Sequence, residues 1–180
     1  MNSKQVLSGA GVVALLVIVV YPALSTGHVS VFVGSSTIQN ADHVYVTIIS
    51  VWAHRAQQAS SEGWELISNE TKIIDLIAPQ DSPTLLAKGQ ISVANYDSVR
   101  IEVLNVTWVF NTTSTSLQPF LSKVSTNTYF TVKTSGGSLI TLMLTGRQEE
   151  VQRTVLMEGR EEQEKTRYFM ASLNATVTET

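Results

Sequence analysis

The chain has 180 residues, of which 43% are hydrophobic and 15% are charged, and its formal net charge is −3. The length suits one domain, because domains usually contain roughly 100 to 200 residues. The composition is too apolar for a disordered chain and too acidic for a nucleic-acid binder. The sequence contains no cysteine, which excludes disulfides, thiolate metal sites and a cysteine nucleophile.

An apolar segment opens the chain. A single positive charge precedes 19 uncharged residues, Val6 to Leu24. As a helix this segment would be about 28 Å long, close to the roughly 30 Å of a bilayer's hydrocarbon core. A proline near its end, with small residues after it, fits a signal-peptidase site. We expect residues 1–27 to be an export signal cleaved near Ser25 or Gly27, with a membrane anchor through residues 6–24 as the alternative.

Residues 28–180 are predicted to form a single β-rich domain. Short runs rich in Val, Ile, Thr and aromatic residues alternate with clusters of Gly, Pro, Ser and Asn. About ten such runs predict an all-β fold, an antiparallel β-sandwich of about 8–10 strands. The predicted strands are 28–33, 43–54, 64–68, 72–78, 88–93, 98–110, 128–134, 138–145, 150–157 and 166–178.

The apolar pattern of 98–110 predicts a β-bulge. Successive strand side chains point to opposite faces, so a buried row recurs every second residue. Val99 to Val103 start one apolar row, and Val106 to Phe110 continue it on the opposite parity. One extra residue near Leu104 would bring both rows to the core. The same bulge would turn Asn105 toward solvent.

Four N-x-[ST] sequons are predicted to be exposed. Asn105 and Asn174 fall on outward-facing rows, and Asn69 and Asn111 fall at strand ends. N-glycosylation requires an accessible asparagine in an exported protein. We therefore expect a glycoprotein in which at least two of the four sequons are modified.

Charged residues concentrate toward the C-terminal end. Of the 12 basic and 15 acidic residues, 11 lie between Arg147 and Arg167. We interpret its central part, residues 158–165 (EGREEQEK), as a solvated hairpin loop between the predicted strands 150–157 and 166–178, whose charges discourage pairing with other chains. An ion site is the alternative, although interleaved basic residues oppose it and the spacing of a calcium loop is absent. Its candidate ligands are Glu158, Glu161, Glu162 and Glu164.

The sequence lacks the usual catalytic signatures, such as G-x-S-x-G, H-E-x-x-H and the Walker loop. We interpret His28, His43 and His54 as surface residues. His43 and His54 are 11 positions apart, which predicts opposite faces of one strand. Asp75, amid apolar residues, is predicted to accept backbone N–H groups at a bend, with a catalytic acid as the alternative. We expect no enzyme activity, no cofactor and no metal site.

Aromatic side chains offer a route to carbohydrate binding, because sugar rings stack on exposed aromatic faces. Trp52 and Trp108 are predicted to pack in the core. Trp64 follows a glycine and begins a short strand, so it is the candidate for an exposed stacking residue. A carbohydrate-binding module of the cell envelope is therefore the alternative function.

Several segments carry a recognisable pattern. A V-x-V-x-I-x-x-V-x-x-H strand runs from Val44 to His54, followed by Gly63-Trp64, Asp75-Leu76 and a strand from Tyr96 to Ile101. In these positions, and in the later FTVKTSGGSLITLML, the chain resembles the prokaryotic family catalogued as domain of unknown function 4382. The resemblance implies an exported β-sandwich. It implies no reaction, because the family has none assigned.

Two positions depart from the family pattern. Gly34-Ser35-Ser36 stands where Asp-Ala-Pro is common, and the aspartate expected after the later leucine run is missing at Leu144 and Thr145. Ion binding that rests on those aspartates is therefore not implied for this chain.

These features together predict a secreted or cell-surface protein with a structural or adhesive role. A sequon-bearing exported chain without cysteine is similar to archaeal surface proteins, whose subunits sometimes polymerise into pilus-like filaments by donating a strand. The candidate donor is His28 to Val33, with Val29, Val31 and Val33 as its apolar row; the alternative is the chain's own first strand. The expected partners are further copies of the chain, or glycans or proteins of the envelope.

Overall fold

A computed structural model describes residues 25–34, 36, 38–77, 83–157 and 160–179. The predicted export segment lies almost wholly outside these residues. Within them, no helix is long and apolar enough to span a bilayer. The described residues form ten strands: β1 (Thr26–Gly34), β2 (His43–Arg55), β3 (Trp64–Ser68), β4 (Lys72–Asp75), β5 (Thr84–Ser92), β6 (Asn95–Phe110), β7 (Thr113–Pro119), β8 (Lys123–Thr131), β9 (Gly137–Met157) and β10 (Arg160–Glu179).

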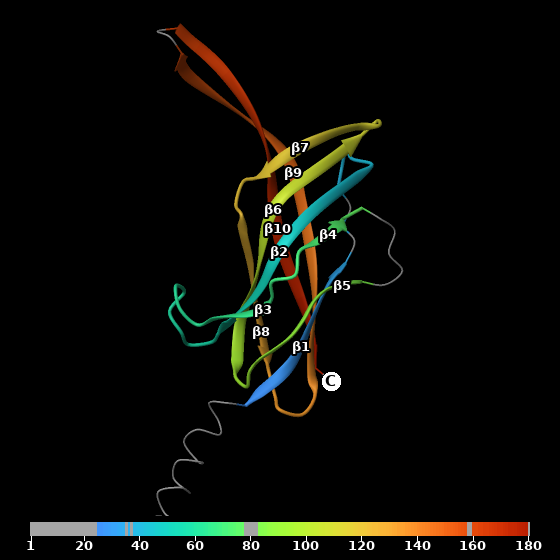
Figure 1. The fold of residues 1–180 in the computed structure, drawn as a ribbon, viewed down its shortest axis with the longest axis vertical. Helices are drawn as coiled ribbons and strands as arrows, with labels where there is room; N and C mark the ends of the chain where they lie inside the picture. The colour runs from blue at the N-terminus through green and yellow to red at the C-terminus, as the bar shows by residue number, and fades with distance from the viewer. Residues whose placement is uncertain (1–24, 35, 37, 78–82, 158–159, 180) are drawn as a thin grey trace, which may run out of the picture.

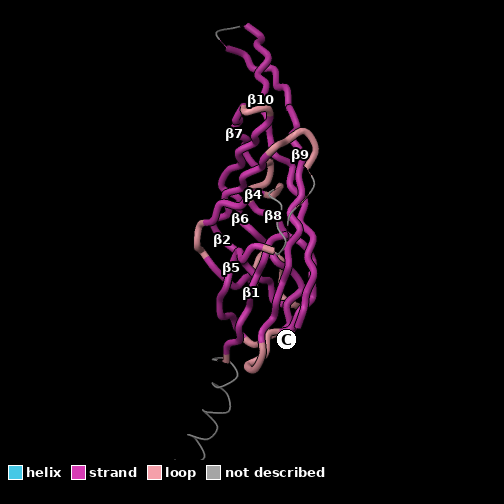
Figure 2. The backbone as a smooth tube through the Cα atoms, turned by 90° about the vertical axis from the view of Figure 1, so that its right-hand side faces the viewer, coloured by secondary structure: helices cyan, strands magenta, loops and turns pink. Residues whose placement is uncertain are grey.

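The strands form two layers, which confirms the predicted β-sandwich (Figures 1 and 2). The β1 layer has the order β5-β1-β9-β10, and the β2 layer places β3 and β4 on one side of β2 and β6, β7 and β8 on the other. The layers join where β10 pairs with β7. The pairing is antiparallel except for β1 with β9 and β10 with β7, which are parallel. Opposite that junction, Glu65 of β3 accepts a 2.9 Å hydrogen bond from the Ser92 N–H of β5.

The core lies between the two layers and consists of alternating inward side chains. The valines of β1 and the inward row of β9 meet the inward rows of β2 and β6 there. Burying one such side chain contributes about 1.5–3 kcal/mol. The completely buried members include Val29, Val31, Val44, Val46, Ile48, Val99, Ile101, Val106, Ile140, Leu142, Leu144 and Phe169.

The bulge predicted near Leu104 is confirmed. Thr47 pairs with Asn105, but Ile48 pairs with Val103, so Leu104 is the extra residue and is 59% exposed. Both apolar rows of β6 therefore reach the core. The row ends at Trp108: the prediction was wrong for Phe110, which is 45% exposed where the strand runs out into its turn.

A second bulge, in β2, was not predicted. Ile48 pairs with Val103 and Ser50 with Glu102, which leaves Ile49 as an extra residue. The parity of β2 reverses there, so Trp52 and His54 lie on the outer face of the layer. The predicted core position of Trp52 is therefore wrong, and so is the expectation that His43 and His54 face opposite sides.

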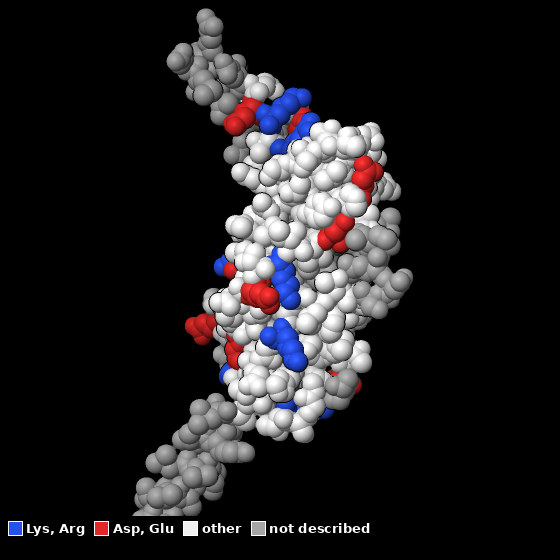
Figure 3. Space-filling view, turned by 45° about the vertical axis from the view of Figure 1, so that its right-hand side comes forward, with Lys and Arg blue, Asp and Glu red and all other residues white. Residues whose placement is uncertain are grey.

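The charged segment is a long two-stranded ribbon, and most of the predicted loop 158–165 is strand, because β10 already begins at Arg160. β9 and β10 pair continuously from Ser138↔Glu179 to Met157↔Arg160 and project beyond the rest of the sheet (Figure 1). Opposite charges meet across the strands: Glu150 lies 3.2 Å from Lys165 and 3.4 Å from Arg167. Such cross-strand pairs stabilise a ribbon whose faces are both solvated. Charged side chains gather at its root, while much of the body visible in Figure 3 is uncharged.

The predicted carboxylate ion site falls largely outside the described part of the chain. Glu158 is not described, nor are the side chains of Glu161 and Glu162. One strand, β7, was missed because its sequence is polar and Leu117 is its single apolar side chain.

Candidate functional site

The outer face of the β2 layer carries a groove of about 410 Å³. Strand register builds it, because Trp64 of β3, His54 of β2, Ser98 of β6 and Asn127 of β8 lie opposite one another in a single row. The bulge at Ile49 is what brings His54 into this row. The lining residues are His54, Gln58, Ser60, Trp64, Asp97, Ser98, Ser125, Asn127 and Tyr129.

Two aromatic side chains of the groove differ in accessibility. Trp64 donates its indole N–H to the Ser60 carbonyl at 3.0 Å, and the Arg100 guanidinium covers its ring at 4.0 Å. Tyr129 is 80% exposed. Trp64, the predicted stacking residue, is thus a half-buried wall, and Tyr129 is the open aromatic surface. The alternation of β8 contained that signal, because the residue after Tyr129 is Phe130, which faces the core at 4% exposure.

His54 anchors the loop that forms one rim of the groove. Its Nδ1 lies 2.7 Å from Asp97 Oδ1 and its Nε2 lies 3.1 Å from the Ala59 carbonyl oxygen. Both ring nitrogens donate at once only in the protonated imidazole. Burial lowers the pKa of His54, but the hydrogen bonds to Asp97 and Ala59 outweigh burial, so the pKa is raised. At 6% exposure His54 is buried, and its predicted surface position is wrong.

The row Ser50–Glu102–Lys123, two rows along the same face, is also fixed by polar contacts. Ser50 Oγ donates to Glu102 at 2.7 Å and accepts the Trp52 indole N–H at 2.8 Å. The hydrogen bond from Ser50, assisted by Lys123 at 3.2 Å, lowers the pKa of Glu102. Trp52 is thereby held beside Arg100, at 5.6 Å from the guanidinium carbon to the ring centre.

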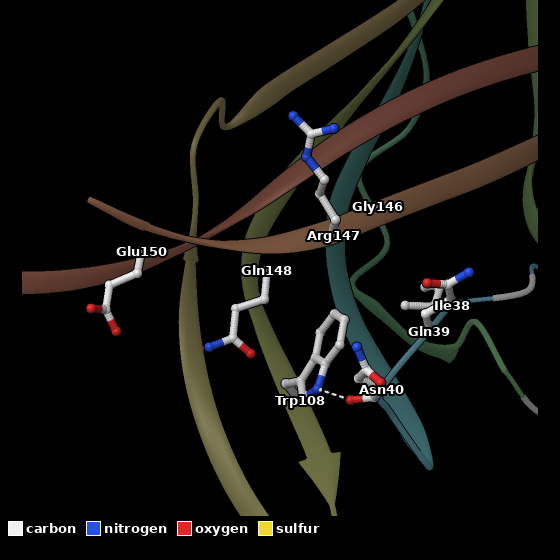
Figure 4. Close-up of a pocket in the computed structure, with 8 residues that line it drawn as sticks. All are labelled: Ile38, Gln39, Asn40, Trp108, Gly146, Arg147, Gln148 and Glu150. Atoms are coloured by element: carbon white, nitrogen blue, oxygen red, sulfur yellow. Dashed lines mark hydrogen bonds between the residues drawn. The ribbon is translucent and has the colours of Figure 1, made fainter.

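A second hollow, of about 560 Å³, lies at the root of the ribbon (Figure 4). The side chains of Gln148 and Glu150 extend from β9 on the side where Trp108 lies, and the side chain of Arg147 extends on the opposite side (Figure 4). Trp108 forms its floor, but this ring is only 6% exposed and its indole N–H is bonded to the Asn40 carbonyl at 2.9 Å. The hollow therefore offers polar groups without an exposed aromatic face.

Asp75 has the structural role that its sequence context predicted. Its Oδ1 accepts the backbone N–H groups of Val44 at 3.2 Å and Ile77 at 3.1 Å, and its Oδ2 lies 2.6 Å from His43 Nδ1. These bonds hold the bend after β4. His28 and His43 are exposed, as predicted.

The predicted donor segment forms β1 within its own chain. β1 pairs with β5 from Thr26 to Val33 and with β9 from His28 to Gly34. Its predicted apolar row is completely or almost completely buried: Val29 is 0%, Val31 0% and Val33 1% exposed.

Comparison with known protein families gives one match, and it covers most of the chain. The family model described as Domain of unknown function (DUF4382) matches residues 26–160. The chain belongs to the DUF4382 family. The match runs from the start of β1 to the first residue of β10. Searches of curated proteins and of solved structures found no match.

The two segments in which this DUF4382 chain departs from the family pattern, one containing Ser36 and the other Leu144, lie next to each other in the fold. Ser36 Oγ donates a 2.5 Å hydrogen bond to the Leu144 carbonyl oxygen. The groups that meet there are neutral. Among the described residues, no three His, Asp or Glu side chains are grouped to hold a metal ion.

All four sequon asparagines of this DUF4382 chain are exposed: Asn69, Asn105, Asn111 and Asn174. Asn69 lies between β3 and β4 and Asn111 between β6 and β7, while Asn105 follows the bulge and Asn174 lies on the outer face of β10. Each side chain is thus accessible to a modifying enzyme.

The His54–Asp97 pair predicts a pH-dependent stability. Folding raises the pKa of His54, so protonated His54 stabilises the fold fully below the unfolded pKa of about 6.5. This stabilisation is lost as the pH rises through the folded pKa. We expect Asp97→Asn to lower the free energy of unfolding by about 1.5 kcal/mol at pH 5 and by less at pH 8. Urea unfolding at both pH values measures the difference.

Asp42→Asn is the matched control, because Asp42 accepts the Asn111 backbone N–H at 2.8 Å and bonds no histidine. Its effect should be the same at both pH values. An Asp97→Asn effect that does not shrink between pH 5 and pH 8 would contradict the assignment of a protonated His54.

Proposed function

We propose that this protein is a non-enzymatic, exported glycoprotein of the cell surface with a structural or adhesive role, and that its chains assemble into a filament by exchanging β1. The observation that supports the proposal most is the position of β1. It is the first strand after the predicted export signal, and it occupies a slot between β5 and β9.

Strand exchange would preserve every contact of that slot. A second copy can supply an identical β1, which would make the same hydrogen bonds to β5 and β9 and bury the same three valines. The start of β1 and the ribbon lie at opposite ends of the molecule (Figures 1 and 2). A strand passed from one copy to the next would therefore join elongated bodies in a row.

The surface features fit an extracellular setting. Four exposed sequons offer attachment points for glycans, and the core needs no disulfide because both layers contribute buried aliphatic rows. Charged residues are only 15% of the chain, so glycans would add the solubility that the surface lacks.

Cysteine cross-linking tests strand exchange, since the natural chain has no cysteine. His28 of β1 and Gln90 of β5 are exposed partners in register, with side-chain nitrogens 3.4 Å apart. We expect His28→Cys and Gln90→Cys chains, mixed under assembly conditions and oxidised, to form disulfide-linked dimers. Non-reducing electrophoresis detects them.

The doubly substituted chain in dilute monomeric form should instead close an internal disulfide, which serves as the geometric control. A pair of His28→Cys and Lys165→Cys chains, with Lys165 exposed on the ribbon at the other end of the molecule, reports random oxidation. Internal closure together with no mixed dimers above that background would refute strand exchange.

A carbohydrate-binding module is the second candidate function, and the groove on the β2 layer favours it. Tyr129 presents an open ring, and the hydroxyl and amide groups of Ser125, Asn127 and Gln58 line the same groove. Sugar sites combine such a stacking surface with a few polar side chains that bond to hydroxyls.

For this second function, we expect Tyr129→Ala to weaken binding to cell-envelope polysaccharides about tenfold or more, because the stacking surface is lost. Trp64→Ala should weaken it as well, through loss of the wall that shapes the groove. Glycan-array binding measures both. Tyr45→Ala, at the far end of β2, is the control. Equal binding by Tyr129→Ala and the unaltered chain would exclude this groove.

A further inference from the structure

We propose that Arg100 makes the groove select glycans that carry a carboxylate, such as uronate-containing polysaccharides. This inference rests on the carbohydrate-binding function proposed above. It names the chemical class of ligand, which that function alone leaves open.

Arg100 is held in a fixed position on the outer face of the β2 layer. It lies in the row beside that of His54 and Ser98, opposite Trp52 on β2 and Ser125 on β8. Its guanidinium lies 4.0 Å from the ring centre of Trp64 and 5.6 Å from that of Trp52. Two indole rings therefore restrict a side chain that is otherwise flexible, and cation–π attraction favours this position.

No carboxylate of the described residues pairs with this cation. Arg55, Arg147 and Arg167 each form an ion pair with a glutamate, and Arg100 forms none. Glu102, the nearest acid on the same strand, bonds to Ser50 and Lys123 instead. Asp97, which lines the groove, is bonded to His54.

The Nε of Arg100 is buried and has no hydrogen-bond partner among the described residues. A buried donor without a protein partner costs stability unless water or a ligand bonds to it. The guanidinium is thus a preorganised, partly dehydrated cation that forms no ion pair with a described carboxylate, while its charge contributes to the lowered pKa of Glu102. Such a group binds carboxylates well, because its planar fork offers paired donors.

The neighbouring groove supplies the remaining contacts of a sugar. Ser125, the register partner of Arg100, lines the groove together with Asn127 and Tyr129. A polysaccharide with one ring on Tyr129 would run along these polar side chains toward Arg100, the register partner of Ser125, where the carboxylate of a further ring would bind. Neutral sugars would make the stacking and hydroxyl contacts only.

Binding to matched polysaccharides tests the inference. The probes are polygalacturonate, alginate and hyaluronate, each compared with its carboxyl-reduced, neutral counterpart. We expect the acidic forms to bind about tenfold more tightly at low salt, and the difference to shrink as salt rises. Arg100→Gln should abolish the difference in affinity between the acidic and the neutral forms.

Lys88→Gln is the charge-matched control, because Lys88 is an exposed cation on β5 in the other layer. It removes the same charge and should leave the preference intact. Thermal unfolding of Arg100→Gln checks that the variant is folded, and Arg100→Lys, which keeps the charge without the fork, should retain only part of the preference.

The outcomes separate the two claims. Equal binding of acidic and neutral forms by the unaltered chain would overturn the role of Arg100 and leave carbohydrate binding standing. Binding to neither form would overturn carbohydrate binding and this inference with it. An acidic preference that survives in Arg100→Gln would also overturn the inference.

Discussion

The slot between β5 and β9 is the constraint on which the rest of the structure depends. Among the described residues, β5 pairs with its layer through β1 alone, and the three valines of β1 complete the core that both layers share. An empty slot would expose that core and two rows of backbone hydrogen-bonding groups. Folding therefore requires a β1 strand, and nothing in the contacts requires that strand to come from the same chain.

The sequence predicted most of the fold because apolar alternation marks strands that have one buried face. The bulge at Leu104 was predictable because polar and apolar residues alternate on both sides of it. The apolar residues occupy odd positions before Leu104 and even positions after it. The bulge at Ile49 was not predictable, because Ile48 and Ile49 are both apolar and either could face the core. β7 escaped prediction because Leu117 is its single large apolar side chain, and residues 160–165 were predicted as a loop because they are all charged or polar and show no apolar alternation.

The composition of the candidate groove depends on one residue, Ile49, whose bulge was not predicted. Trp64 was identified from its local context, but Trp52 and His54 join it only because the Ile49 bulge turns the second half of β2. Strand periodicity without that bulge places Trp52 in the core. The groove lies on the β2 layer and the slot on the β1 layer, so the proposed assembly and the proposed ligand binding would use separate surfaces.

Complementation by a peptide tests the central claim about the slot most directly. A chain that lacks residues 1–34 would be mixed with a synthetic peptide of residues 26–34, and its unfolding followed by circular dichroism. We expect the truncated chain alone to show no cooperative unfolding transition. Adding the peptide should restore a cooperative transition, and adding a peptide with Val31→Ser should not. Cooperative unfolding of the truncated chain alone, or an unfolding curve that the peptide does not change, would contradict the requirement for β1.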